Sequence, residues 1–179
     1  MLSNKQNSAK SLSARRSYMV AVALAVAFLL GMAYMRSQAA TVSAAPLLDL
    51  RFGYSQSDIA VFFSQFDDGG VDRLVAFWRF DYWYMLLYGA FYVTAIWQLS
   101  AQHGRKYRWL LLCAPATAVL CGATENTILE YMLNHGVTSG LAQAAQMATV
   151  IKFGAAYTSL ALVIGLTAWN AYLSRQKRQ

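Results

Sequence analysis

The sequence predicts an all-α, polytopic membrane protein: a bundle of four transmembrane helices with a short amphipathic helix on its outer face. Three observations support this fold class. Of the 179 residues, 58% are hydrophobic and 13% are charged, whereas a soluble domain carries about 25% charged residues. The chain contains several apolar stretches long enough to cross a bilayer as helices. Basic residues gather in segments that contain no acidic residue, as they do in cytoplasmic loops.

The basic segments set the predicted orientation. They lie before the first apolar stretch, between the second and the third, and after the fourth, which predicts a multi-pass protein of the cell (inner) membrane with both termini in the cytoplasm. Binding to nucleic acid is the alternative, but no basic surface with interleaved aromatic residues accompanies these segments. We therefore expect the lipid bilayer, and no nucleic acid, as partner. The basic residues are Lys5, Lys10, Arg15, Arg16, Arg105, Lys106, Arg108, Arg175, Lys177 and Arg178.

The two ends of the chain are predicted to lie outside a single transmembrane domain that covers residues 18–173. Residues 1–17 are polar, serine-rich and basic, and are expected to form a disordered cytoplasmic tail; residues 174–179 form a second tail. Residues 18–35 are apolar without a charge and form the first span. A cleaved signal peptide is the alternative, because small residues follow. The run exceeds the roughly 7–15 apolar residues of a signal core, which favours a retained span.

An outer loop with an interfacial helix is predicted over residues 36–70. Ser57 suits the N-cap of this helix and Asp58 its first turn. Gly69 and Gly70 are expected to end it with a left-handed turn. Because the helix is short and amphipathic, it should lie flat on the outer interface or form a lid on the bundle. Its apolar stripe consists of Ile59, Phe62, Phe63 and Phe66.

Three further spans are predicted, over about 77–100, 109–133 and 141–172. Short turns join the second span to the third and the third to the fourth, so these spans should be antiparallel neighbours. Pro115 lies inside the third span and should kink it.

The cysteine pattern gives no sign of a metal or a disulfide. Cys113 and Cys121 are eight residues apart on one predicted helix, or roughly 12 Å at the helical rise, which is too far for a disulfide. No cysteine–histidine motif typical of a metal site is present. We expect no metal and no cofactor.

Ionisable residues inside the predicted spans mark the candidate site. Asp81, Glu125 and Lys152 lie on three different spans, each roughly 12–17 Å from the outer end of its helix at the helical rise. A charge at mid-membrane costs roughly 2.5–3.5 kcal/mol on insertion scales, so we expect an ion pair between Glu125 and Lys152, with Asp81 as a second carboxylate. The expected polar cluster is Asp81, Tyr84, Tyr88, Glu125, Asn126 and Lys152, with Thr149 able to add a hydrogen bond.

The pattern leaves the function open among several classes. The cluster could be a purely structural clasp that sets the helix register. The favoured hypothesis is a binding or scaffold protein whose buried site holds a lipid-like or small amphipathic ligand. The alternatives are an intramembrane acid/base enzyme of the isomerase type, in which Glu125 or Asp81 exchanges a proton, and a small proton- or ion-coupled carrier. A chain of four spans would need to oligomerise to serve as a carrier.

Most of the chain after residue 45 resembles an uncharacterised family of small bacterial integral membrane proteins with four spans. The residues that carry this resemblance are Gly53-Tyr54, the Phe-rich helix, Gly70, Phe80-Asp81 with Tyr88, Glu125-Asn126 in the third span and Lys152-Phe153 in the fourth. The Glu-Asn pair is the most specific of them. The family often has an acidic residue three positions earlier, where this chain has Gly122. The resemblance implies the four-span topology and no particular activity.

Overall fold

The computed structural model of the chain describes residues 2–43, 46–102 and 104–176. Every regular element in these ranges is helical, which confirms the all-α prediction. The elements in chain order are α1 (Leu2–Val42), the 3-10 helix η1 (Leu48–Leu50), α2 (Gln56–Phe63), α3 (Asp68–Leu99), α4 (Arg105–Leu111), α5 (Cys113–His135) and α6 (Ser139–Gln176).

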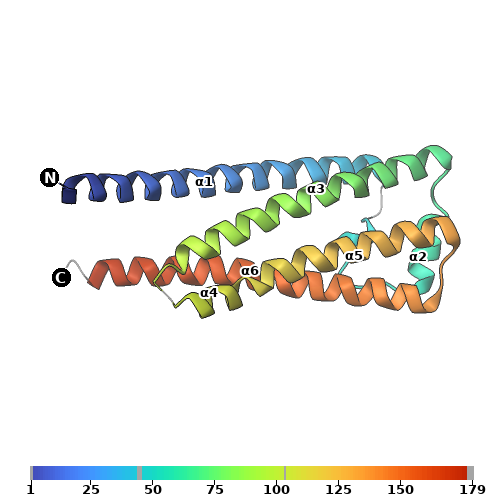
Figure 1. The fold of residues 1–179 in the computed structure, drawn as a ribbon. Helices are drawn as coiled ribbons and strands as arrows, with labels where there is room; N and C mark the ends of the chain where they lie inside the picture. Colours follow the sequence, from blue (N-terminus) through green and yellow to red (C-terminus); the bar gives the residue numbers. More distant parts are fainter. Residues whose placement is uncertain (1, 44–45, 103, 177–179) are drawn as a thin grey trace.

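The long helices α1, α3, α5 and α6 lie roughly along one direction, and α5 covers only the part of the molecule toward α2 (Figure 1). α5 and α6 form the most extensive helix pair, α3 contacts both of them, and α1 packs on α3. The start of α1, the end of α6 and the short helix α4 lie toward one end of the molecule, whereas α2 and the turn between α5 and α6 lie toward the other (Figure 1). The three basic segments of the sequence belong to the first of these ends.

Two of the described helices are long and apolar enough to cross a membrane. They are Met19–Val42 within α1 and the whole of α6, Ser139–Gln176. Only 6% and 17% of the residues in their most apolar stretches are buried, so most of this apolar surface is not covered by the protein itself. The other two predicted spans, on α3 and α5, do not meet this standard. The stretch of α3 after its last charge, residues 82–99, is rich in tyrosine and tryptophan, and α5 carries the polar residues Glu125, Asn126 and Glu130.

Helix α1 extends further toward the N-terminus than the sequence predicted. It begins at Leu2 and so includes residues 2–17, which were expected to be disordered. The physical reason is local: no glycine or proline occurs before Gly31, and alanine, leucine, lysine and arginine, which favour helix, are spaced among the serines of this segment. At the other end, α6 continues to Gln176, and the expected tail residues 177–179 lie outside the described residues.

The start of α2 differs by two residues from the prediction. Ser55, not Ser57, is the N-cap: its hydroxyl accepts a hydrogen bond from the Asp58 amide, and the Asp58 carboxylate accepts one from the Ser55 amide at 2.7 Å. This reciprocal arrangement is a capping box, which needs an acidic or amide side chain three residues after the cap. Only Ser55 has that spacing from Asp58, so Ser55 takes the position.

The junction between α2 and α3 is also tighter than predicted. The aspartates and glycines expected to end α2 instead begin α3, because Asp67 caps α3 by accepting a hydrogen bond from the Gly70 amide at 2.7 Å. Neither Gly69 nor Gly70 has a positive φ angle; among the described residues Gly136, at the end of α5, is the only one that does.

Near Pro115 the regular helix is interrupted at a single residue. α4 ends at Leu111 and α5 begins at Cys113; Leu112 between them keeps helical backbone angles, and its amide donates to the carbonyls of Arg108 and Trp109. Proline has no amide proton and its ring crowds the preceding turn, so the regular hydrogen bond from residue 115 to the Leu111 carbonyl cannot form. The predicted span 109–133 is therefore made of two helices.

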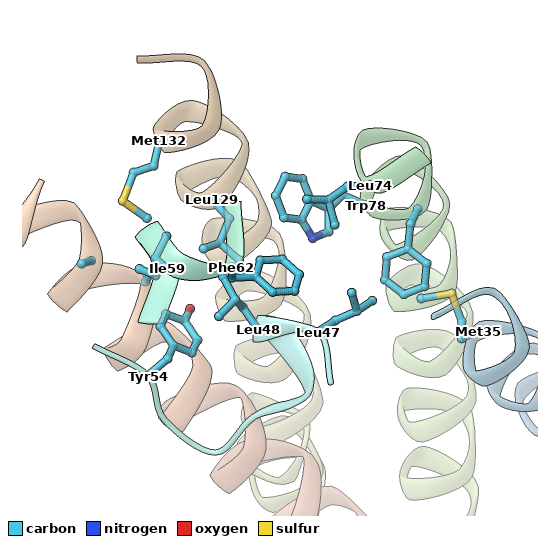
Figure 2. Close-up of a cluster of buried hydrophobic side chains, with 13 residues drawn as sticks. Met35, Leu47, Leu48, Tyr54, Ile59, Phe62, Leu74, Trp78, Leu129 and Met132 are labelled. Carbon is cyan, nitrogen blue, oxygen red and sulfur yellow. The ribbon is translucent and has the colours of Figure 1, made fainter. Parts of the chain in front are cut away.

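The main hydrophobic core lies where α2 covers the bundle. Ile59 and Phe62 of α2 are almost fully buried and pack with Leu129 of α5 and Trp78 of α3 (Figure 2). Of the two placements considered for the amphipathic helix, flat on an interface or a lid on the bundle, the structure has the lid. The chain before α2 is held in the same core through Tyr54.

Candidate functional site

Helix α5 supplies two adjacent polar side chains that join the bundle. Glu125 and Asn126 are both fully buried. Consecutive residues on a helix point about 100° apart, and the two side chains reach different neighbours: Glu125 meets Lys152 of α6, and Asn126 meets Asp81 of α3. The Glu-Asn dipeptide therefore ties α3, α5 and α6 together at one level.

The predicted ion pair is present. Lys152 Nζ lies 2.5 Å from Glu125 Oε2, and the Lys152 side chain is 12% exposed. The other carboxylate oxygen, Oε1, accepts a hydrogen bond from Thr149 and lies 3.1 Å from the Tyr54 hydroxyl. Both oxygens thus have partners, which a charged carboxylate in a low-dielectric interior requires.

Tyr54 reaches this cluster from the loop between α1 and α2. Its hydroxyl is 3.0 Å from Thr149 Oγ1 as well as 3.1 Å from Glu125. Burial, together with the charge of Glu125, raises the pKa of the Tyr54 hydroxyl well above its ordinary value. The phenol consequently remains protonated and can donate to the cluster.

Asp81 is the second carboxylate of the cluster, as the sequence predicted. It is 7% exposed, and its Oδ2 accepts a hydrogen bond from Asn126 Nδ2 at 2.8 Å. Arg79, which could have neutralised it, is exposed and does not join the cluster.

A third carboxylate, Asp49, was missed by the sequence analysis. It lies in η1, is 3% exposed, and its backbone carbonyl accepts a hydrogen bond from Lys152 Nζ at 2.9 Å. Its side-chain oxygen Oδ1 is buried without a hydrogen-bond partner. Burial and, after it, the charge of the Asp81 carboxylate raise the pKa of Asp49 to about 7, against the opposing effect of the Lys152 ammonium. The available signal was an acid placed among leucines, at Leu48-Asp49-Leu50.

The two predicted tyrosines take a different role from the expected one. Tyr88 donates a hydrogen bond to the Ala118 carbonyl at 3.3 Å, not to a carboxylate. The Tyr84 ring packs against Phe28 and comes so close to α1 that a side chain at Gly31 would contact it at 3.0 Å. The rings of Tyr84 and Tyr88 are 5.6 Å apart and edge-on. Both tyrosines therefore form an aromatic wall next to the polar cluster.

This wall belongs to a cavity of about 450 Å³ between α1, η1, α3 and α6. At its polar end lie Asp49, Asp81 and Lys152. Glu125 and Asn126 do not line the cavity. They contact two residues that do, Lys152 and Asp81, and so help to position them. The rest of the lining is apolar, and its aromatic residues are Phe28, Tyr84, Tyr88, Tyr92, Phe153 and Tyr157.

Gly122 makes room for this arrangement. A side chain at Gly122 would lie 2.9 Å from Met85 Sδ and 3.2 Å from Lys152 Cδ. The position at which the resembled family often carries an acid is thus occupied here by the Met85 and Lys152 side chains.

The cluster has the composition of a site for a ligand that donates hydrogen bonds. It contains three carboxylates, of Asp49, Asp81 and Glu125, and one ammonium, of Lys152. In the described part of the chain, no group of three or more His, Cys, Asp or Glu side chains is placed to hold a metal ion.

No protein-family model, curated protein or solved structure shows significant similarity to this chain. The family resemblance seen in the sequence therefore stays a prediction.

Proposed function

We propose that this chain is a multi-pass integral membrane protein that binds a lipid-like amphipathic molecule in the cavity between α1, α3 and α6. The observation that carries the proposal is the lining of the cavity. Its walls are aromatic and aliphatic, and the charged residues that line it are Asp49, Asp81 and Lys152. Among these, the Asp49 Oδ1 atom is buried without a hydrogen-bond partner. Pockets for small molecules are mostly apolar with a few placed polar groups.

Membrane placement is supported by surface that the protein leaves uncovered. Large side chains such as Leu30 of α1 and Ile164 of α6 are more than half exposed, although contiguous exposed apolar patches are uncommon on soluble proteins. In the proposed four-span topology, which is that of the resembled bacterial family, α3 and α5 also cross the membrane. Their charged groups Asp81 and Glu125 are buried inside the bundle. The basic segments collected toward one end support cytoplasmic termini in the inner membrane.

The charge of the cluster favours a particular head group. Asp49 and Asp81 are hydrogen-bond acceptors at the cavity, and Lys152 already donates to Glu125 and to the Asp49 carbonyl. A hydroxyl or amine head would donate to the carboxylates, whereas a phosphate or carboxylate head would be repelled by them. The proposed ligand is therefore an amphipath with an alcohol or amine head and a hydrocarbon tail.

Native mass spectrometry of the purified protein tests this proposal. We expect a co-purifying lipid-like molecule on the wild type. Ala156→Trp would fill the apolar part of the cavity and should remove the molecule. Ile151→Trp makes the same kind of change on α6 at an exposed position that does not line the cavity, and should retain it. Equal occupancy of both variants would contradict the proposal, as would a wild type that carries nothing.

The topology has a separate test. With Cys113 and Cys121 replaced by serine, single cysteines at Ser57→Cys and Lys106→Cys report the two ends of the bundle, since both positions are exposed. A membrane-impermeant maleimide added to intact cells should label the first and should label the second only after lysis. The intact mass of the membrane-embedded protein shows whether α1 is retained, as its contribution of Phe28 and Met32 to the cavity requires.

A second candidate function, intramembrane acid/base catalysis, is favoured by one observation. Asp49 lines the cavity and has a pKa of about 7, and a proton-exchanging catalyst works best with a pKa near the working pH. The test is to incubate a lipid extract of the host cells with the protein in D₂O. A lipid that gains deuterium with the wild type but not with Asp49→Asn would support catalysis; unchanged lipid masses would leave binding as the function.

A further inference from the structure

A second groove shares no lining residue with the cavity. It has a volume of about 560 Å³ and is formed by the end of α3, by α4 and by Leu112. We call it the arginine groove; its lining residues are Val93, Trp97, Arg105, Arg108, Trp109 and Leu112.

Arg108 is held in this groove with one buried donor unpaired. Its guanidinium carbon lies 3.7 Å from the centroid of the Trp97 ring, and Nη2 donates to the Trp97 carbonyl at 2.6 Å. The Trp109 ring lies edge-on to Trp97, with centroids 5.4 Å apart. Arg108 Nε is buried and has no hydrogen-bond partner. The two tryptophans therefore hold a cation whose hydrogen bonds are incomplete.

Among the described residues, no acidic side chain forms an ion pair with the arginines of the groove. Arg105 is exposed and, within the described ranges, makes no ion pair. The sequence contains no aspartate or glutamate between Asp81 and Glu125. A negative charge at the groove would therefore have to come from a ligand.

The walls of the groove favour a ligand that also has an apolar part. Apart from the arginines they are apolar or aromatic, and Trp109 also borders a neighbouring groove of about 360 Å³ lined by Lys106, Leu110 and Cys113. Two apolar grooves on either side of Trp109, with basic residues beside them, match the two hydrocarbon chains and the charged head of a phospholipid. Basic pockets of this kind at a membrane surface bind anionic lipid head groups.

We propose that the arginine groove binds an anionic phospholipid, with its phosphate at Arg105 and Arg108 and its acyl chains on either side of Trp109. The site rests on the membrane placement proposed above, but it is independent of the central cavity and of its ligand. Because Arg105 is exposed and makes no ion pair with any residue that the structure describes, its replacement should not disturb the fold.

The test uses the purified full-length chain in a neutral detergent, titrated with phosphatidylglycerol or with phosphatidylcholine and followed by native mass spectrometry. We expect the wild type to prefer phosphatidylglycerol. Arg105→Gln should bind it about fivefold more weakly, which corresponds to one basic residue near an anionic lipid surface. Arg79→Gln, the same change at an exposed arginine of α3 outside the groove, should stay within about twofold of the wild type. Val93→Trp, which fills the groove and keeps both arginines, should also lose the lipid.

Three results would overturn the proposal. The first is an equal loss in Arg105→Gln and Arg79→Gln, which would indicate general charge attraction. The second is equal binding of the two lipids. The third is displacement of phosphatidylglycerol by excess inorganic phosphate, which would indicate a phosphate site without a role for the acyl chains. Should Val93→Trp fail to fold, the two arginine variants decide the matter. Retention of the central ligand by Arg105→Gln would separate this site from the proposed cavity function.

Discussion

The Tyr54 hydroxyl lies 3.1 Å from Oε1 of Glu125, although 71 residues separate the two side chains in the chain. This contact brings the loop between α1 and α2 into the middle of the helix bundle. The same loop supplies the Asp49 carbonyl that accepts a hydrogen bond from Lys152. The polar cluster is therefore built from one loop and three helices, and its stability depends on all four.

Removing the Glu125 charge should be strongly destabilising. Glu125→Gln leaves the Lys152 ammonium buried without its counter-ion, and breaking a buried pair in this way costs about 3–5 kcal/mol. The measurement is unfolding of the purified protein in detergent by heat or denaturant. Glu130→Gln, on the same helix but outside the cluster, should change stability by less than about 0.5 kcal/mol.

The double variant Glu125→Gln with Lys152→Met separates the pair from the rest of the cluster. Because it removes both charges, its loss of stability should be clearly smaller than the sum of the two single losses. Strict additivity would show that the two side chains do not depend on each other. If the double variant folds and no longer carries a bound molecule, the cluster is a ligand site as well as a clasp.

The stability of the protein should depend on pH through Asp49. Its pKa is about 7 in the folded protein against 3.8 for an ordinary aspartate, so the folded state binds this proton more tightly than the unfolded state does. The resulting stabilisation is complete below about pH 4 and is lost as the pH rises through about 7. Wild-type Tm should therefore be higher at pH 5 than at pH 8.

Asp49→Asn should reduce this difference, because the amide does not titrate, and the variant should be the more stable protein at pH 8. Asp72→Asn changes an exposed aspartate and should leave the pH dependence as it is in the wild type. A wild-type Tm that rises between pH 5 and pH 8, with Asp49→Asn following it, would contradict the assignment.

The contact between α3 and α5 should not tolerate a side chain at Gly89. An added Cβ would lie 2.7 Å from Val119 Cγ2, and the branched valine side chain has little freedom to move. Gly89→Ala should cost about 1–3 kcal/mol, as overpacking does in other cores. Gly154→Ala meets nothing within 4 Å and should be neutral, or stabilising by up to about 1 kcal/mol through helix propensity. Unfolding measurements on the two variants give the comparison.

The N-cap of α2 can be assigned by a pair of serine variants. Ser55→Ala removes the capping box and should cost about 1 kcal/mol, together with faster hydrogen exchange of the α2 amides. Ser57→Ala removes only a hydroxyl that lies 2.7 Å from the Ser55 hydroxyl and should have a much smaller effect. A larger effect of Ser57→Ala would indicate that Ser57, the residue predicted from the sequence, is the N-cap.

Part of the candidate site could be predicted from sequence because helices have a fixed rise. Counting residues from the helix ends was enough to place Asp81, Glu125 and Lys152 at one level, and the ion pair between the last two is present. The prediction of four membrane spans has weaker support from the structure. Only α1 and α6 are apolar enough by themselves, because tyrosine and tryptophan residues lower the hydropathy of α3, and the buried Glu125 and Asn126 lower that of α5.

Asp49 and Tyr54 could not be placed in the same way. A loop has no regular rise, and its path depends on contacts with helices distant in sequence, such as those of Tyr54 with Glu125 and Thr149. The shift of the α2 cap has a different origin: two serines competed for it, and only the three-residue spacing to Asp58 decided between them.

The packing of α1 has a consequence for how a molecule would reach the cavity. α1 contributes Phe28 and Met32 to the lining, yet its extensive contacts are with α3 alone. The boundary between α1 and α6 is therefore a weak wall of the cavity. A hydrophobic guest would enter sideways from the surrounding lipid through this seam, and its residence time would depend on how readily α1 tilts away from α6. Cross-linking the two helices would then trap a guest already inside and exclude a new one.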